Sequence, residues 1–131
     1  MDYSIKYSVE CLLGIERAIL SSLITNDNTD EMEVCFKIIE ANDFYYQQHG
    51  IIYNTIIEMY KSDKKIDENT VFLSNQQNIN EQYYIDIITT TPPTSIKEYL
   101  NQLKKYSYER QMIIVATKIK EGDFSKVNEL Q

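Results

Sequence analysis

Apolar residues recur at intervals of three and four positions along much of the chain, which is the period of an α-helix with one buried face. The first such stretch runs from Val9 to Ile24, and its polar residues, Glu16 and Ser21 among them, fall largely on the other side. Its apolar positions are Leu12, Ile15, Ile19 and Leu23. A polar segment, 25–30, interrupts the pattern, and a second, short helix is expected after it. The apolar positions of that helix are Met32, Cys35, Ile38 and Ile39.

Three further helices are expected before the first proline. The pattern predicts one from about Gln47 to Lys61, ending in the turn-forming segment 62–65. Asp67 is a good N-cap for the next helix, because its carboxylate can accept hydrogen bonds from free backbone N–H groups of the first turn. The segment 83–91 is ambiguous, since its β-branched and aromatic residues also favour a strand. Sustained strand-like alternation is found nowhere in the chain.

A long helix is expected to follow Pro92 and Pro93. Ser95 and Glu98 have the spacing of a reciprocal N-terminal capping box. Because no glycine or proline interrupts the chain as far as Lys120, the helix can extend for about 25 residues, or roughly 37 Å at 1.5 Å per residue. Gly122 and the residue after it supply a C-terminal stop.

These elements predict an all-α protein in three parts. Residues 1–93 are expected to form a globular helical head, and 94–122 the long helix. Residues 123–131 read like the opening of one further helix, so the chain is interpreted as a piece cut from a longer protein. A head of this size cannot cover a helix of about 25 residues, and part of that helix should lie outside it.

The chain has 20 acidic and 13 basic residues, which gives a formal net charge of −7. Residues 1–93 carry 15 acidic and 6 basic side chains, or −9, whereas 94–131 carry 5 and 7, or +2. Because nucleic-acid binding depends on basic side chains that neutralise phosphates, we expect no strong direct binding to DNA. No apolar run reaches the roughly 18 residues that a membrane span needs, and the N-terminus lacks a signal pattern. A cytoplasmic protein without membrane contact is therefore expected.

No set of residues suits catalysis or a metal. A phosphate-binding loop needs glycines and a lysine at a fixed spacing, which Gly14, Gly50 and Gly122 cannot supply. His49 is the sole histidine and has no nucleophile elbow, so we interpret it as a structural residue that anchors a loop by hydrogen bonds. Asp43 is interpreted as a cap or turn residue rather than a general base, and the other carboxylates are expected on exposed faces. We expect no ATP hydrolysis.

The two cysteines, Cys11 and Cys35, sit singly among apolar residues and form no CxxC pair. Free cysteine behaves as a small hydrophobe, so both are expected to be buried, reduced thiols rather than metal ligands.

Residues 43–53 carry the most specific pattern in the chain. Asp43-Phe44-Tyr45, three residues, His49, two residues and Ile52-Tyr53 resemble the DFYxxxHxxI[FY] signature of the N-terminal domain of bacterial replicative DNA helicases of the DnaB type. Elements that resemble the same family in the same order are Ile15 to Leu20, Ile66-Asp67 with Thr70-Val71, Ser95-Ile96 with Tyr99, and Arg110 to Ile119. Two positions depart from the family pattern, because Ser21 replaces a usual glycine and Ser95 an asparagine.

The resemblance implies an all-α head of about six helices, followed by a long helix that begins an antiparallel helical hairpin. In that family the domain forms a collar on a hexameric helicase, organises the hexamer as a trimer of dimers, and docks the helicase-binding domain of primase. It would bind proteins, without a catalytic residue or cofactor, while ATP and Mg belong to a separate motor domain. The structural motif of the head would be Asp43, Phe44, Tyr45, His49, Ile52 and Tyr53.

The candidate protein interface is the stretch from Arg110 to Ile119. It lies on a helix too long for the head to bury, and yet it keeps a stripe of apolar residues that includes Val115. The candidate interface residues are Arg110, Met112, Ile113, Ala116, Thr117 and Ile119. We expect self-association through this stretch, as a dimer or as part of a hexamer.

Two other functions are compatible with parts of the sequence. The helicase-binding domain of a primase resembles this collar domain in fold, although the DFYxxxHxxI[FY] pattern favours the helicase. A stand-alone enzyme is the alternative from a different class, and the absence of a nucleophile with its base, or of a metal set, disfavours it.

Overall fold

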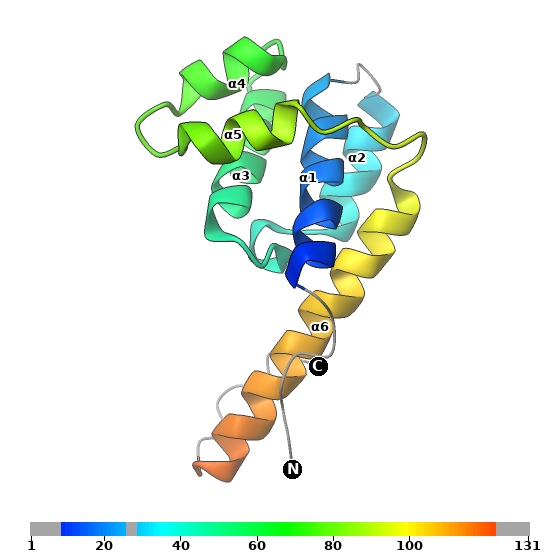
Figure 1. The fold of residues 1–131 in the computed structure, drawn as a ribbon, viewed down its shortest axis with the longest axis vertical. Helices are drawn as coiled ribbons and strands as arrows, with labels where there is room; N and C mark the ends of the chain where they lie inside the picture. The colour runs from blue at the N-terminus through cyan, green and yellow to red at the C-terminus, as the bar shows by residue number, and fades with distance from the viewer. Residues whose placement is uncertain (1–8, 26–28, 123–131) are drawn as a thin grey trace.

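The computed structural model describes residues 9–25 and 29–122, and both ranges are helical without any strand. Five α-helices and a short 3-10 helix form a compact head, and a sixth α-helix extends away from it (Figure 1). The elements are α1 (Val9–Thr25), α2 (Thr29–Ile38), η1 (Ala41–Asp43), α3 (Gln47–Lys61), α4 (Glu68–Ser74), α5 (Glu81–Ile88) and α6 (Lys97–Lys120). The all-α fold class is therefore confirmed, and the helix assignment of α5 resolves the ambiguity of its sequence.

The helix at the centre of the head is α1, which packs against α3, α5 and α6. Its apolar positions Leu12, Ile19 and Leu20 are fully buried. Glu16 and Ser21 are buried as well, so the prediction that they lie on an exposed side is wrong. Most of α1 is covered by neighbouring helices, and the polar residues on its covered sides must find partners inside the protein.

The second layer of the core joins α2 to α3. Tyr53 of α3 is fully buried, and its hydroxyl donates hydrogen bonds to the carbonyl oxygens of Ile39 (2.9 Å) and Cys35 (3.3 Å). The Cys35 carbonyl lies in the last turn of α2 and also accepts a 3.0 Å hydrogen bond from the Ile39 N–H, while Ile39 directly follows the helix. Burial raises the pKa of the Tyr53 phenol well above its ordinary value, so the hydroxyl remains a donor at neutral pH.

The short helices α4 and α5 both begin at a side-chain cap. Asp67 accepts hydrogen bonds from the backbone N–H groups of Asn69 and Thr70, which confirms the predicted N-cap, and the bond from Thr70 lowers the pKa of the Asp67 carboxyl. Asn80 caps α5 in the same way. Tyr84 and Ile87, three residues apart, then face the core, so burial on one helical face outweighs the strand propensity of this segment.

The long helix α6 begins at Lys97, and the predicted capping box of Ser95 and Glu98 is wrong. The N-cap position is taken by Ile96, which makes no side-chain cap, and Ser95 only accepts a 3.4 Å hydrogen bond from the Lys97 N–H. Burial of the Ile96 side chain in the core accounts for this start. At the other end Gly122 has a φ of 88° and its N–H donates to the Ile119 carbonyl, as the predicted glycine stop requires. The further helix predicted for 123–131 lies outside the described residues.

The two cysteines differ in their surroundings, so the prediction of a buried pair is wrong for one of them. Cys35 is fully buried beside Tyr53, whereas Cys11 is exposed on α1. Cys11 lies near the start of α1, next to the buried Leu12 but on the outer side of the helix. Burial raises the pKa of the Cys35 thiol to about 12.

We expect one of the two thiols to react quickly with a maleimide at pH 8. The thiolate is the reactive form, and a pKa of about 12 leaves only about one Cys35 thiol in ten thousand ionised at that pH. Mass spectrometry of the native protein should show a single adduct on Cys11, and the denatured protein should carry two. The variant Cys11→Ser serves as the control, and rapid labelling of that variant in the folded state would contradict the burial of Cys35.

Candidate protein-interaction site

Glu16 organises the turn that precedes α3, although it lies on α1. Its Oε2 accepts a 2.6 Å hydrogen bond from the Tyr45 N–H, and its Oε1 accepts a 3.3 Å bond from the Tyr46 N–H. Tyr46 is the N-cap residue of α3 and offers no side-chain cap itself. The carboxylate from α1 therefore satisfies free N–H groups at the positive end of α3.

His49 adds a third donor to the same carboxylate. Its Nδ1 lies 2.7 Å from Glu16 Oε1, and both side chains are completely buried. A carboxylate only accepts hydrogen bonds, so this contact assigns the proton to Nδ1. The rings of Phe44, Tyr46 and Tyr83 surround the imidazole, with centroids 5.2 to 6.4 Å away. His49 lies inside the head, joined to the loop through Glu16.

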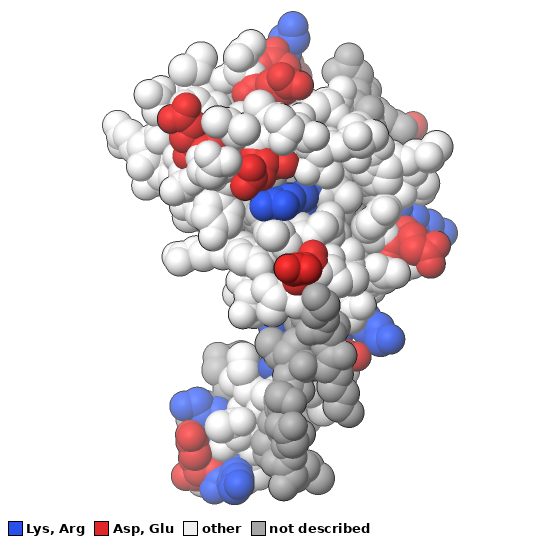
Figure 2. Space-filling view, viewed as in Figure 1, with Lys and Arg blue, Asp and Glu red and all other residues white. Residues whose placement is uncertain are grey.

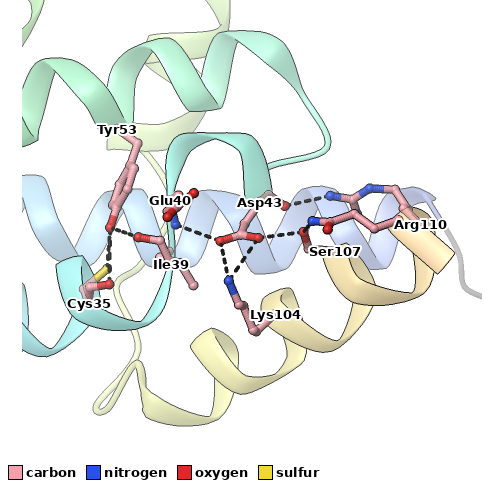
Figure 3. A network of polar contacts seen from close by, with 9 residues as sticks. Cys35, Ile39, Glu40, Asp43, Tyr53, Lys104, Ser107 and Arg110 are labelled. Carbon is pink, nitrogen blue, oxygen red and sulfur yellow. Dashed lines mark hydrogen bonds and ion pairs between the residues drawn. The ribbon is translucent and has the colours of Figure 1, made fainter. Parts of the chain in front are cut away.

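Asp43 connects the same turn to α6, and Figure 3 shows the residues involved. One carboxylate oxygen accepts a 2.7 Å hydrogen bond from the Glu40 N–H, which closes η1, and lies 3.2 Å from Lys104 Nζ. The other accepts a 2.7 Å hydrogen bond from Ser107 Oγ. Asp43 is thus a turn residue, as predicted from the sequence, but it is also nearly fully buried. The expectation that carboxylates other than Asp43 lie on exposed faces is wrong for Glu16. Asp43 and Glu16 can both be buried because each carboxylate accepts several hydrogen bonds.

Arg110, further along α6, also makes a polar contact with Asp43. Its NH2 group donates a 2.7 Å hydrogen bond to the Asp43 carbonyl, and its guanidinium lies 5.5 Å from the centre of the Tyr45 ring. Lys104, Ser107 and Arg110 are three residues apart and share one face of the helix. We call Asp43 and these three partners the α6 clamp.

Phe44, Ile52 and Tyr53, the apolar members of the predicted motif, lie in the core directly behind the turn. All three are buried, and the rings of Phe44 and Tyr53 are 5.1 Å apart. Gly50 lets the backbone of α3 approach η1, since a Cβ atom there would lie 2.9 Å from the Ala41 carbonyl oxygen. The six motif residues thus meet at one place, where α1, α3 and α6 converge on residues 43–46.

From Tyr108, which lies between Ser107 and Arg110, to the end of the helix, α6 carries exposed apolar residues. Tyr108, Met112 and Ile119 have exposed fractions of 53%, 44% and 43%. Positions 108, 112 and 119 fall on one side of a helix, and Ala116, which is half-buried, lies close to them. We call Tyr108, Met112, Ala116 and Ile119 the distal stripe. Ile113 is half-buried, Thr117 is exposed, and Val115, expected in the exposed stripe, is buried.

Sequence reasoning missed several residues that hold this site together. The sequence pattern placed Glu16 on an exposed side, and it singled out neither Lys104 nor Ser107 as a contact of the head. A signal for the clamp exists in the spacing of Lys104, Ser107 and Arg110, but their partner lies more than 60 positions away. Tyr108 is four residues before Met112, and this spacing could have extended the apolar stripe toward the head.

Charged groups on the face in Figure 2 form small mixed clusters rather than one basic surface. Among the described residues, no group of three or more histidine, cysteine or acidic side chains is arranged to hold a metal ion. None of the helices in these ranges has the length and apolar character needed to cross a membrane. The geometry is that of a helical domain with an extended helix suited to contacts with other proteins.

The chain belongs to the DnaB-like helicase N terminal domain family, whose sequence profile matches residues 9–105. It is 27% identical over 112 residues to the replicative DNA helicase DnaB of Helicobacter pylori strain J99, covering 84% of this chain and 23% of that protein. It is 28% identical over 105 residues to a probable replicative DNA helicase of Trieres chinensis, covering 75% of this chain and 23% of that one. The match decides against the primase alternative.

Solved structures show the same fold. The N-terminal domain of DnaB helicase from Helicobacter pylori, whose structure was described with its interactions with primase, superposes with a TM-score of 0.80 at 26% identity. That superposition covers 86% of this chain and 92% of the other. The corresponding domain from Mycobacterium tuberculosis has a TM-score of 0.72 at 17% identity, with 90% and 89% coverage. The chain spans about a quarter of the length of the curated relatives and matches their N-terminal domain alone.

Proposed function

We propose that this chain is the collar domain of a hexameric replicative DNA helicase, a non-catalytic module that organises the hexamer and docks primase in the cytoplasm. The distal stripe is the observation that carries the proposal. It places exposed apolar side chains along one side of α6, from Tyr108 beside the clamp to Ile119 near the end of the helix, which extends away from the head (Figure 1). Ordinary solvated helices do not carry such a row, and apolar rows of this spacing pair with matching helices.

Residues 1–93 would act as the head and 94–122 as the arm that makes contact with a neighbouring subunit. The contact surface would include the residues expected from the sequence, Arg110, Met112, Ile113, Ala116, Thr117 and Ile119. Tyr108 would belong to it as well, because it is part of the distal stripe. Primase docking is supported by the relative from Helicobacter pylori, whose structure was described with its interactions with primase. ATP and Mg would serve a motor domain elsewhere in the whole protein, and DNA would be bound there rather than by this acidic domain.

We expect the chain to associate reversibly with itself, and Met112→Asp or Ile119→Asp to weaken this association by at least about tenfold. Pairing would bury either side chain, and a carboxylate introduced there would lose its hydration without gaining a partner. Sedimentation velocity over a range of protein concentrations measures the effect. Adding the helicase-binding domain of a primase to the same samples should produce a faster-sedimenting complex.

The matched control is Gln102→Asp, which adds the same charge to an exposed position on the part of α6 that packs on the head. It should associate like the parent chain. A parent chain that stays monomeric at the highest concentration, or stripe variants that assemble unchanged, would refute self-association through α6. A primase domain that leaves the sedimentation profile unaltered would refute docking by this chain.

A further inference from the structure

We propose that Asp43 is a positioning residue, which fixes the direction in which the distal half of α6 leaves the head. Its role in placing the distal stripe rests on the proposed function, but its role in fixing the helix direction does not. The proposal follows from where the contacts of α6 with the head occur and where they end.

The first half of α6 is held by apolar contacts. Ile96, Leu100 and Leu103 are buried in the core of the head, so this part of the helix cannot shift without opening the core. Apolar burial is not directional, and side chains that slide past one another allow small rotations between packed helices. Contacts close to one end of a helix therefore fix its position better than its direction.

The clamp adds directional contacts at the point where the helix leaves the head. Hydrogen bonds from Ser107 and Arg110, and the ion pair of Lys104, all converge on Asp43. Hydrogen bonds depend steeply on angle as well as distance, and those made to a buried carboxylate are among the strong ones. Asp43 is 3% exposed and Ser107 is buried as well, so water screens the bond between them little, whereas the Lys104 side chain is about half exposed and its ion pair is screened more.

Asp43 itself is firmly placed. The Glu40 N–H holds its carboxylate, and the neighbouring Tyr45 N–H is held by Glu16 of α1. The turn therefore offers α6 a fixed set of acceptors rather than a mobile loop. Because about ten residues separate Arg110 from Lys120, a swing of about 20° at the clamp moves the helix tip by roughly 5 Å. A displacement of that size would misalign an apolar stripe with a partner helix.

The test is a distance measurement within one chain. Spin labels are attached at Gln77→Cys on the head and Lys120→Cys at the end of α6, in a Cys11→Ser background, and each labelled sample is diluted with excess unlabelled protein. The variant Asp43→Asn keeps the shape of the side chain but removes its charge. We expect the distance distribution to broaden or shift by several Å, while circular dichroism shows unchanged helix content.

A second variant keeps the experiment informative if Asp43→Asn does not fold. Lys104→Met with Ser107→Ala removes two donors to the carboxylate but leaves the Glu40 contact that closes η1. This double variant should broaden the distance distribution. The single variant Lys104→Arg keeps a cation beside Asp43 and leaves Ser107 intact, so it should give the parent distribution. The matched control is Asp67→Asn, which makes the same chemical change at the half-buried cap of α4, far along the chain from α6. It should lower the melting temperature without altering the distance.

A distribution in the Lys104→Met, Ser107→Ala protein that matches the parent in centre and width would overturn the proposal. If the clamp stabilised the fold without fixing the helix direction, this variant would melt at a lower temperature than the parent but keep the parent distance. Loss of helix direction should in turn weaken self-association by roughly tenfold, since a partner would have to restore the order that the clamp supplies. A broadened distance with unaltered association would support the clamp and count against the distal stripe as the association surface.

Discussion

Replacing Glu16 with glutamine is expected to lower the free energy of unfolding by about 3 kcal/mol. The side chain keeps its size, but one of its two oxygens becomes an NH2 group that must face a donor. The three donors that now share the carboxylate are the N–H groups of Tyr45 and Tyr46 and the Nδ1 of His49. Glu16 and His49 are fully buried, so water cannot accept the hydrogen bond of the donor that loses its carboxylate oxygen.

Urea denaturation followed by circular dichroism measures this change in stability. The matched control is Glu58→Gln, the same substitution at an exposed position on α3, which should change stability by no more than about 0.5 kcal/mol. A Glu16→Gln protein with the same urea midpoint as the parent would show that the buried carboxylate does not organise the turn before α3.

Truncating Phe44 or Ile52 to alanine is expected to cost about 2 to 4 kcal/mol in each case, because both leave a cavity in a close-packed core. Phe44 packs its ring against Tyr53, and Ile52 is fully buried on the inner face of α3. For a domain whose total stability is about 5 to 15 kcal/mol, either loss is a large fraction. Thermal melting and urea denaturation should both show the two variants to be less stable than the parent.

Leu73→Ala is the control for these truncations, since that leucine is the most exposed of the large apolar residues described, at 67%. It should melt within a few degrees of the parent. If Phe44→Ala melted like Leu73→Ala, the placement of the predicted motif in the core would be wrong, and residues 43–46 would need another anchor.

Local signals in the sequence predicted the local structure well. The bounds of α3, the cap at Asp67 and the glycine stop at Gly122 each depend on residues within a few positions of one another. The capping box at Ser95 failed because burial of Ile96 determined where α6 begins. Segment 83–91 stayed ambiguous because its propensity and its tertiary contacts favour different structures.

Long-range polar contacts could not be predicted in the same way. The amphipathic pattern of α1 assumes one exposed side, and Glu16 is buried because α3, α5 and α6 enclose that helix. The bonds that Asp43 accepts from Lys104 and Ser107 join residues 61 and 64 positions apart. A single sequence gives the spacing of the clamp residues on α6, but not the partner that they share.

The unbroken course of α6 from Lys97 to Lys120 has a consequence for how its two ends are related. A regular helix turns by about 100° per residue, so the angular position of each side chain is set by counting residues from the clamp. Residues seven apart differ by only about 20°, which is why Met112 and Ile119 share one side. Inserting or deleting one residue after Arg110 would turn Met112, Ala116 and Ile119 through about 100° about the helix axis, while Tyr108 kept its place. The head and the distal stripe are therefore related by the number of residues between them, and not only by which residues those are.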